Sequence, residues 1–199
     1  VYPDAIAHAT TAADVAERAG LTELLSHALF VAGLAHTDLG QADAVPLLDR
    51  SIAISEEHGL HRIRGAALGN LGIHHYTEGR WDEAVEYYRA SRDAKLHAGD
   101  PLWAAVQENN VAEILSDQGR LEDAEPGFRD MVRVSRASLF PIGAALGTSN
   151  LGRLAARDGR FAEAHELLDA AAAAFSTIDA SRYVNETNAR RAECLVLEG

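Results

Sequence analysis

The chain repeats itself every forty residues, and this repeat constrains the fold more than any other feature of the sequence. The dipeptide Gly79-Arg80 returns without a gap as Gly119-Arg120 and again as Gly159-Arg160. The same residue types recur at fixed distances around each pair: Ala84, Ala124 and Ala164 after it, and Asn70, Asn110 and Asn150 before it. So many matches in register predict a protein built from stacked copies of one structural unit.

Within each repeat the apolar residues follow helical spacing. Leu68 and Leu71, and then Trp81, Ala84 and Tyr88, are three or four residues apart, which places each group on one face of a helix. Glycine tolerates the left-handed conformation that ends helices, so the repeated glycines mark helix ends. In the third repeat, Phe140-Pro141 is expected to stop the helix where the glycine is missing. The expected helices are 3–19, 22–38, 42–58, 61–78, 81–98, 101–118, 121–137, 141–158, 161–177 and 181–198.

Two helices joined by a short connection cannot bury their apolar faces alone, so successive hairpins must stack. We therefore expect an all-α fold, an α-solenoid of antiparallel helical hairpins with about ten helices. No linker rich in proline or serine interrupts the chain, which predicts one solenoid domain over residues 1–199. The first residue is Val1 and Gly199 lies inside a further copy of the motif, so we expect this domain to come from a longer protein.

Composition excludes several classes of function. The net charge of −12 disfavours nucleic-acid binding, and no apolar run reaches the roughly 18 residues that a membrane span requires. A single cysteine, Cys194, fits a reducing cytoplasm. Phosphate loops, nucleophile elbows and Cys-x-x-Cys pairs are absent from the sequence, so we expect neither an enzyme nor a cofactor. The pair His74-His75 could suggest a metal, but adjacent helical residues point about 100° apart, and we interpret the histidines as surface or partly buried residues instead.

The residues Asn70-Leu71-Gly72, Gly79, Trp81, Ala84 and Tyr88 resemble the tetratricopeptide repeat (TPR) motif. The usual period of that family is shorter, and arrays of about forty residues resemble the C-terminal TPR regions of large bacterial signalling proteins that also carry an ATPase domain and either a nucleotide cyclase or a DNA-binding regulator. The resemblance implies that the first helix of each hairpin lines a concave groove that binds peptides.

Small residues recur where the two helices of a hairpin should touch, namely at Gly72, Ala112, Gly152, Ala84, Ala124 and Ala164. Because only small side chains let helix axes approach to about 8 Å, we interpret them as packing positions. Trp81, Phe161, Tyr88 and Phe128 are interpreted as core residues rather than as a ligand cage.

The resemblance places the repeated asparagines on the groove, where an amide can donate and accept hydrogen bonds with a peptide main chain. A structural role, in which each asparagine bonds the neighbouring repeat, stays open as the alternative. Residues one turn away from these asparagines on the same helices should also line the groove. In the last repeat these residues include Arg190 and Glu193. The candidate groove residues are Asn70, Ile73, Thr77, Asn109, Asn110, Glu113, Asp117, Ser149, Asn150, Arg153, Arg157 and Arg190. Their charges predict a groove that is acidic in the middle and basic toward the C-terminal end, unless they form an ordinary solvated helix face.

The expected function is that of a non-catalytic interaction or regulatory module, which binds a peptide, a partner protein or another domain of its own parent protein. The alternative is a small-molecule sensor that controls an attached effector, for which a pocket lined by asparagine, arginine and aromatic residues would be evidence. A homodimer through the ends of the solenoid is a third expectation, because the last helix ends in the apolar run Leu195-Val196-Leu197.

Overall fold

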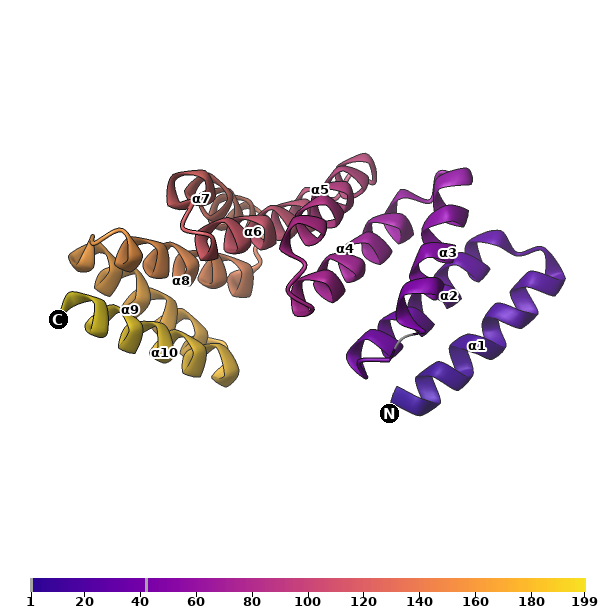
Figure 1. Cartoon of the computed structure of the whole chain (residues 1–199), viewed down its shortest axis with the longest axis horizontal. Coiled ribbons are helices and arrows are strands. Elements are labelled where there is room, and N and C mark those ends of the chain that lie inside the picture. Colours follow the sequence, from indigo (N-terminus) through magenta and orange to yellow (C-terminus); the bar gives the residue numbers. More distant parts are fainter. Residues whose placement is uncertain (1, 42) are drawn as a thin grey trace. The chain divides into compact units, whose positions relative to one another are not determined.

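The computed structural model describes residues 2–41 and 43–199, and within them all regular structure is helical (Figure 1). The ten helices are α1 (Tyr2–Ala19), α2 (Thr22–Asp38), α3 (Ala44–Glu57), α4 (His61–Thr77), α5 (Trp81–His97), α6 (Pro101–Asp117), α7 (Leu121–Ala137), α8 (Pro141–Arg157), α9 (Phe161–Thr177) and α10 (Ser181–Glu198). The sequence expectation is confirmed at every helix, with ends that differ by at most one residue outside α3. The expected start of α3 at residue 42 lies outside the described residues.

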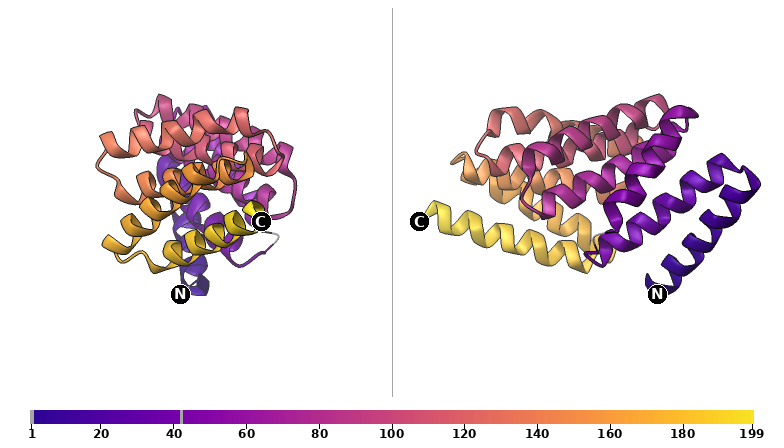
Figure 2. Two further views of the ribbon diagram at one scale, coloured as in Figure 1. Left: turned by 90° about the vertical axis from the view of Figure 1, so that its left-hand side faces the viewer. Right: turned by 45° about the vertical axis from the view of Figure 1, so that its right-hand side comes forward.

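The helices group into two compact units, which divide between Asp100 and Pro101. Unit 1 contains α1 to α5 and unit 2 contains α6 to α10. In both units each helix packs against the next one along the chain. Alternate helices also meet, since α2 contacts α4 in unit 1 and α8 contacts both α6 and α10 in unit 2. The helical hairpins can be followed in two further directions in Figure 2.

The repeated glycines end their helices in the left-handed conformation. Gly79 has a φ of 75° and Gly119 a φ of 78°. The amide that follows each glycine then turns back onto the helix, so that Arg80 N donates to His75 O at 2.9 Å and Arg120 N donates to Leu115 O at 2.9 Å. These bonds satisfy carbonyl groups that would otherwise lack a partner at the helix end.

The third repeat makes the same turn without glycine. Leu139 adopts a φ of 52°, and Phe140 N donates to Ser135 O at 2.9 Å. The expectation that Phe140-Pro141 stops the helix is therefore incomplete, because the turn geometry is carried by Leu139. A left-handed conformation costs a residue with a Cβ atom about 1–2 kcal/mol. The side chain of Leu139 offers little packing in return, since the residue is 90% exposed.

We predict that Leu139→Gly raises the free energy of unfolding by about 0.5–1 kcal/mol. The gain is the relieved left-handed strain minus the larger entropy that glycine has in the unfolded chain. Urea unfolding followed by circular dichroism measures it. Leu139→Ala removes the same apolar side chain but keeps the Cβ atom, so it should not stabilise; equal effects of the two substitutions would contradict the strain argument.

The small residues of the motif lie where the helices of a hairpin meet. Ala84, Ala124 and Ala164 are fully buried. A Cβ atom on Gly72 would lie 2.5 Å from the ring of Tyr88, and one on Gly152 would lie 2.8 Å from Leu168 Cγ. In the third repeat Ala112 occupies the corresponding position, and the opposing residue is Gly127, whose Cβ would lie 2.9 Å from that of Ala112. The interpretation of these residues as packing positions is confirmed.

We predict that Gly72→Ala lowers the free energy of unfolding by about 1–2 kcal/mol, although alanine is the better helix former, because the new methyl group overlaps the Tyr88 ring. Thermal unfolding and urea unfolding both measure the loss. Combining Gly72→Ala with Tyr88→Ala provides the control: the double variant should be more stable than the sum of the two single losses. Strict additivity would contradict the clash.

Candidate functional site

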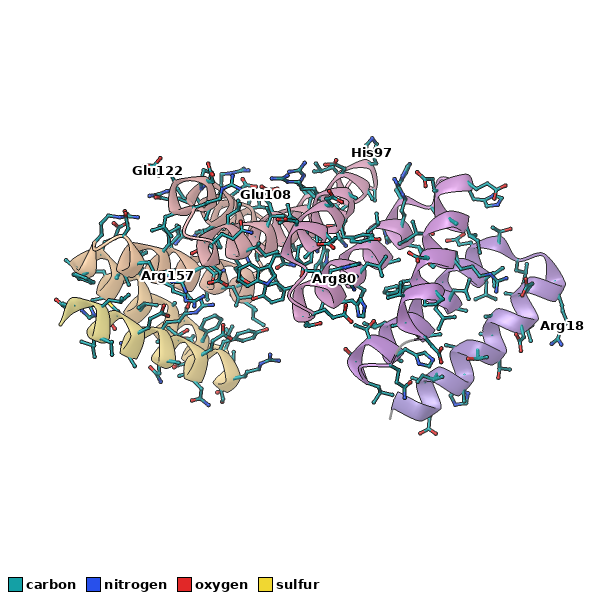
Figure 3. The ribbon with its side chains drawn as sticks, viewed as in Figure 1. Arg18, Arg80, His97, Glu108, Glu122 and Arg157 are labelled. Atoms are coloured by element: carbon teal, nitrogen blue, oxygen red, sulfur yellow. The ribbon has the colours of Figure 1, made fainter. Side chains whose placement is uncertain are left out.

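A ladder of polar side chains crosses the first helices of the three successive repeats in unit 2. We call it the polar ladder, and it consists of Asn109, Glu113, Ser116 and Asp117 on α6, Ser149, Asn150, Arg153 and Arg157 on α8, and Glu186, Arg190 and Glu193 on α10. Residues in this ladder that lie about forty positions apart contact one another because the repeat stacks equivalent helices side by side. Figure 3 labels one of them, Arg157 on α8.

Asn150 is the centre of one half of the ladder. Its Nδ2 donates to Asn109 Oδ1 at 2.9 Å and to Glu113 Oε1 at 2.7 Å. Its Oδ1 accepts a bond of 2.5 Å from Arg190 Nη1, which also donates to Ser149 Oγ at 3.0 Å. Arg190 Nη2 bonds Glu186 on its own helix. Asn150 and Asn109 are buried, so these bonds fix both amide groups in one orientation.

Two arginines of α8 form the other half. Arg153 Nη1 and Arg157 Nη1 donate to Asp117 Oδ1 at 3.2 and 2.8 Å, respectively. Their Nε atoms donate to the two oxygens of Glu193 at 3.0 and 3.2 Å. Arg157 also bonds the main-chain carbonyl of Ser116 at 3.1 Å. Two cations and two carboxylates therefore share one cluster that is electrically neutral and still partly exposed to solvent.

Burial and neighbouring charges shift the pKa values of the ladder residues in opposite directions. Desolvation raises the pKa of Glu113, although hydrogen bonds from Asn150 and Asn109 and the charge of Arg190 oppose this. Desolvation likewise lowers the pKa of Arg190. Desolvation alone would raise the pKa of Glu193. The hydrogen bonds and charges of Arg153 and Arg157 outweigh it, so the pKa of that carboxyl group is lowered. The charged forms of Glu113 and Arg190, in the half of the ladder that contains Asn150, are therefore the ones that burial penalises most.

The structure brings eight of the twelve candidate groove residues together in the polar ladder: Asn109, Glu113, Asp117, Ser149, Asn150, Arg153, Arg157 and Arg190. Asn110 is half-buried on α6, and the contact with Asn150 comes from Asn109, one residue earlier. Three candidates lie in unit 1. Asn70 donates to Ala66 O of its own helix at 2.9 Å, Thr77 bonds His74 O, and Ile73 is exposed.

The expected charge gradient is wrong in one respect. The sequence predicts that Arg153, Arg157 and Arg190 make the C-terminal end of the groove basic, but each of them is paired with carboxylates inside the ladder. The charge compensation comes from Glu193 and Glu186 on α10, and from Asp117 on α6. Sequence reasoning missed Glu186 and Ser116. The spacing of four residues between Glu186 and Arg190 could have indicated the first, but Ser116 acts partly through its main-chain carbonyl, which no sequence pattern marks.

A cavity of about 560 Å³ in unit 2 lies elsewhere, among α7, α8 and α9. Its lining is dominated by apolar groups such as Phe140, Pro141, Ala145 and Ala171, and it contains none of the polar-ladder residues. Its lining includes one arginine, Arg136, and one aromatic residue, Phe140, but no asparagine, so it matches the lining expected of a small-molecule pocket only in part.

The described residues also bear on two other classes of site. Among residues 2–41 and 43–199, no group of three or more histidine, cysteine, aspartate or glutamate side chains is placed to hold a metal ion. In the same part of the chain, no helix is both long enough and apolar enough to cross a bilayer.

Comparison with known proteins agrees with this architecture. The tetratricopeptide repeat family model matches residues 32–96. BtubC (BKLC) from P. vanneervenii has a similar structure, with a TM-score of 0.72 and 17% sequence identity over 99% of this chain and 91% of that one. A variant of a Podosopora anserina protein designated a kinesin light chain, with nearly identical TPR-like repeats, gives a TM-score of 0.68 and 18% identity over 89% of this chain and 88% of that one. No protein with a curated description matches the sequence.

The fold is therefore a TPR-like α-solenoid, and residues 32–96 match the repeat family itself. Tetratricopeptide repeats generally mediate protein–protein interactions. The polar ladder lies on the first helices of the repeats in unit 2, outside the part of the chain that the family model matches.

We predict that Glu113→Gln reduces the dependence of stability on pH over the range above 4.5, the ordinary pKa of a glutamate side chain. The raised pKa means that the folded state binds a proton more readily than the unfolded state, so the contribution of Glu113 is full below the unfolded pKa and is lost as the pH rises through the folded pKa. The free energy of urea unfolding should therefore fall across this range more steeply in the original protein than in the variant. Parallel curves would show that Glu113 ionises as it does in the unfolded chain.

Proposed function

We propose that the chain is a non-catalytic protein-interaction module, and that the polar ladder of unit 2 binds an extended peptide segment. The segment comes from a partner protein or from another domain of the parent protein. The observation that carries this proposal is the connected row of polar side chains across α6, α8 and α10, which places hydrogen-bonding groups side by side on successive repeats.

The internal bonds of the ladder support this role because they fix its side chains before a partner arrives. Arginine and glutamate lose considerable rotamer freedom when they are held in one geometry, and a ladder that is already ordered spares the complex that cost. Arg153, Arg157, Asp117 and Glu193 all retain exposed surface, so a partner can reach them without breaking the cluster.

Charge balance indicates which chemistry the surface accepts. The cluster of Arg153, Arg157, Asp117 and Glu193 carries two positive and two negative charges, and so offers donors and acceptors without a strong net field. A peptide main chain, which presents N–H and C=O groups at regular intervals, matches such a surface better than a phosphate or another multiply charged ion does.

The test is a selection of peptides from a random displayed library on the purified chain, followed by measurement of their dissociation constants by fluorescence anisotropy. We predict that Arg153→Gln combined with Arg157→Gln weakens the selected peptides at least tenfold. The exposed residues Arg129 and Arg133 of α7 provide the matched control. Their double replacement by glutamine removes the same charge from α7, the second helix of the preceding hairpin, and it should change affinity less than twofold.

Both double variants should remain folded, because the partners that they leave behind are partly exposed and can be solvated. Circular dichroism and the melting temperature check this. Equal weakening by both variants would show that only long-range charge matters. Peptides that bind tightly but are insensitive to the ladder variant would contradict the proposed site.

A further inference from the structure

The apolar cavity of unit 2 lies between two hairpins that are both complete in the structure. Its walls are the end of α7, the first half of α8 and the second half of α9, and α8 packs against both of the other helices (Figure 1). α8 and α9 form one hairpin, and α7 is the second helix of the hairpin before it. The volume of about 560 Å³ is in the range of pockets that bind small molecules.

The repeat register explains why this space is not filled. In the preceding hairpin, Met131 and Val134 of α7 are buried, and they pack in one cluster with side chains of α6. Forty residues later, the equivalent positions on α9 hold Ala171 and Ala174. Both alanines line the cavity, and Ala171 packs with Ala145 of α8. Two large apolar side chains are thus replaced by methyl groups, which leaves room beside α8.

The lining offers one charged group on an otherwise apolar surface. Of the described residues that line the cavity, Arg136 alone carries a charge, and its guanidinium group has no ion pair or hydrogen bond with any of them. The hydroxyl groups of the lining already donate elsewhere. Thr148 Oγ1 donates to Ala144 O at 2.8 Å, and Ser135 Oγ donates to Met131 Sδ at 3.6 Å. A ligand in this cavity therefore meets apolar walls and a single cation.

Leu139 lines the same cavity in a backbone conformation that costs free energy. Its φ of 52° lies in the left-handed region, and the equivalent residue forty positions earlier is Gly99, with a φ of 72°. Leu139 is nevertheless 90% exposed, so packing within the chain does not repay this cost. Strained residues of this kind are concentrated at binding sites. A large apolar side chain held at the rim of an apolar cavity gains a packing partner when a ligand enters.

Gly143 on α8 determines where the aromatic wall of the cavity lies. A Cβ atom on this residue would lie 2.5 Å from Phe140 Cδ1 and 2.5 Å from Ser135 Oγ. Phe140 can therefore lie against α8 only because residue 143 has no side chain. Phe140 and the neighbouring Pro141 both line the cavity, and neither has many rotamers to lose. This wall is thus in place before a ligand arrives, which lowers the entropic cost of binding.

We propose that this cavity binds a free aliphatic carboxylate, with its alkyl chain against the alanines of α8 and α9 and its carboxylate group at Arg136. A guanidinium group forms two parallel hydrogen bonds with a carboxylate, and each methylene group that leaves water for the cavity adds to the affinity. The net charge of −12 repels small anions from the protein as a whole, so the apolar walls are needed to retain one. The site shares no residue with the polar ladder and is independent of peptide binding there.

The test is isothermal titration calorimetry of the purified chain with dodecanoate, below its micelle-forming concentration, and with dodecylammonium, which has the same alkyl chain and the opposite charge. We expect one dodecanoate per chain, and binding of dodecylammonium that is at least tenfold weaker. Arg136→Gln should weaken dodecanoate at least tenfold. Arg133→Gln is the matched control, because Arg133 lies about one turn earlier on α7, is paired with Asp130 and does not line the cavity. It should change the affinity less than twofold.

Two further variants place the alkyl chain. Leu139→Gly should weaken dodecanoate at least threefold although it stabilises the fold, a combination that a merely structural role of Leu139 does not produce. Ala174→Leu fills the cavity from α9 and should abolish binding; because Ala174 is exposed, the circular dichroism spectrum should stay unchanged.

Three results would overturn the proposal. Equal affinity for dodecanoate and dodecylammonium would show that Arg136 does not recognise the head group. An affinity for dodecanoate that Ala174→Leu leaves unchanged would place the alkyl chain on another apolar surface. The third result is the absence of saturable dodecanoate binding to the original chain.

Discussion

The close approach of two helices within each hairpin is the contact on which the rest of the structure depends. Gly72 faces the Tyr88 ring, Gly152 faces Leu168, and Ala112 faces Gly127, so that each pair combines residues whose summed size fits the gap. The third pair shows that the constraint acts on the pair rather than on one position. When the first helix carries alanine instead of glycine, the second helix supplies the glycine.

This packing fixes the spacing of the first helices, and the spacing creates the polar ladder. Asn150 reaches Asn109 and Glu113 on one side, and its carbonyl oxygen accepts a bond from Arg190 on the other, because α6, α8 and α10 lie in parallel register. The same geometry lets Arg153 and Arg157 connect Asp117 with Glu193. The ladder therefore joins successive repeats and also presents ordered polar groups, so the structural and the peptide-binding roles of these residues are compatible in one surface.

The polar ladder is already ordered by its internal bonds, and its cluster of Arg153, Arg157, Asp117 and Glu193 is electrically neutral. These two properties are the physical basis of the proposal that the ladder binds an extended segment, because such a segment presents regular hydrogen-bonding groups and little charge.

The sequence by itself determined the helices and their hairpins, because the forty-residue repeat, the helical spacing of apolar residues and the terminal glycines are local signals. It also brought eight ladder residues into one candidate set, because equivalent residues of a repeat fall on equivalent faces. Only the tertiary structure decided which atoms meet. It placed Asn109 rather than Asn110 against Asn150, since a helix rotation of one residue, about 100°, changes which side chain faces the neighbour. It paired the three arginines with carboxylates from adjacent repeats, which no spacing along one helix could reveal. It also put Leu139 in a left-handed turn, because the hairpin geometry required that conformation whichever residue occupied the position.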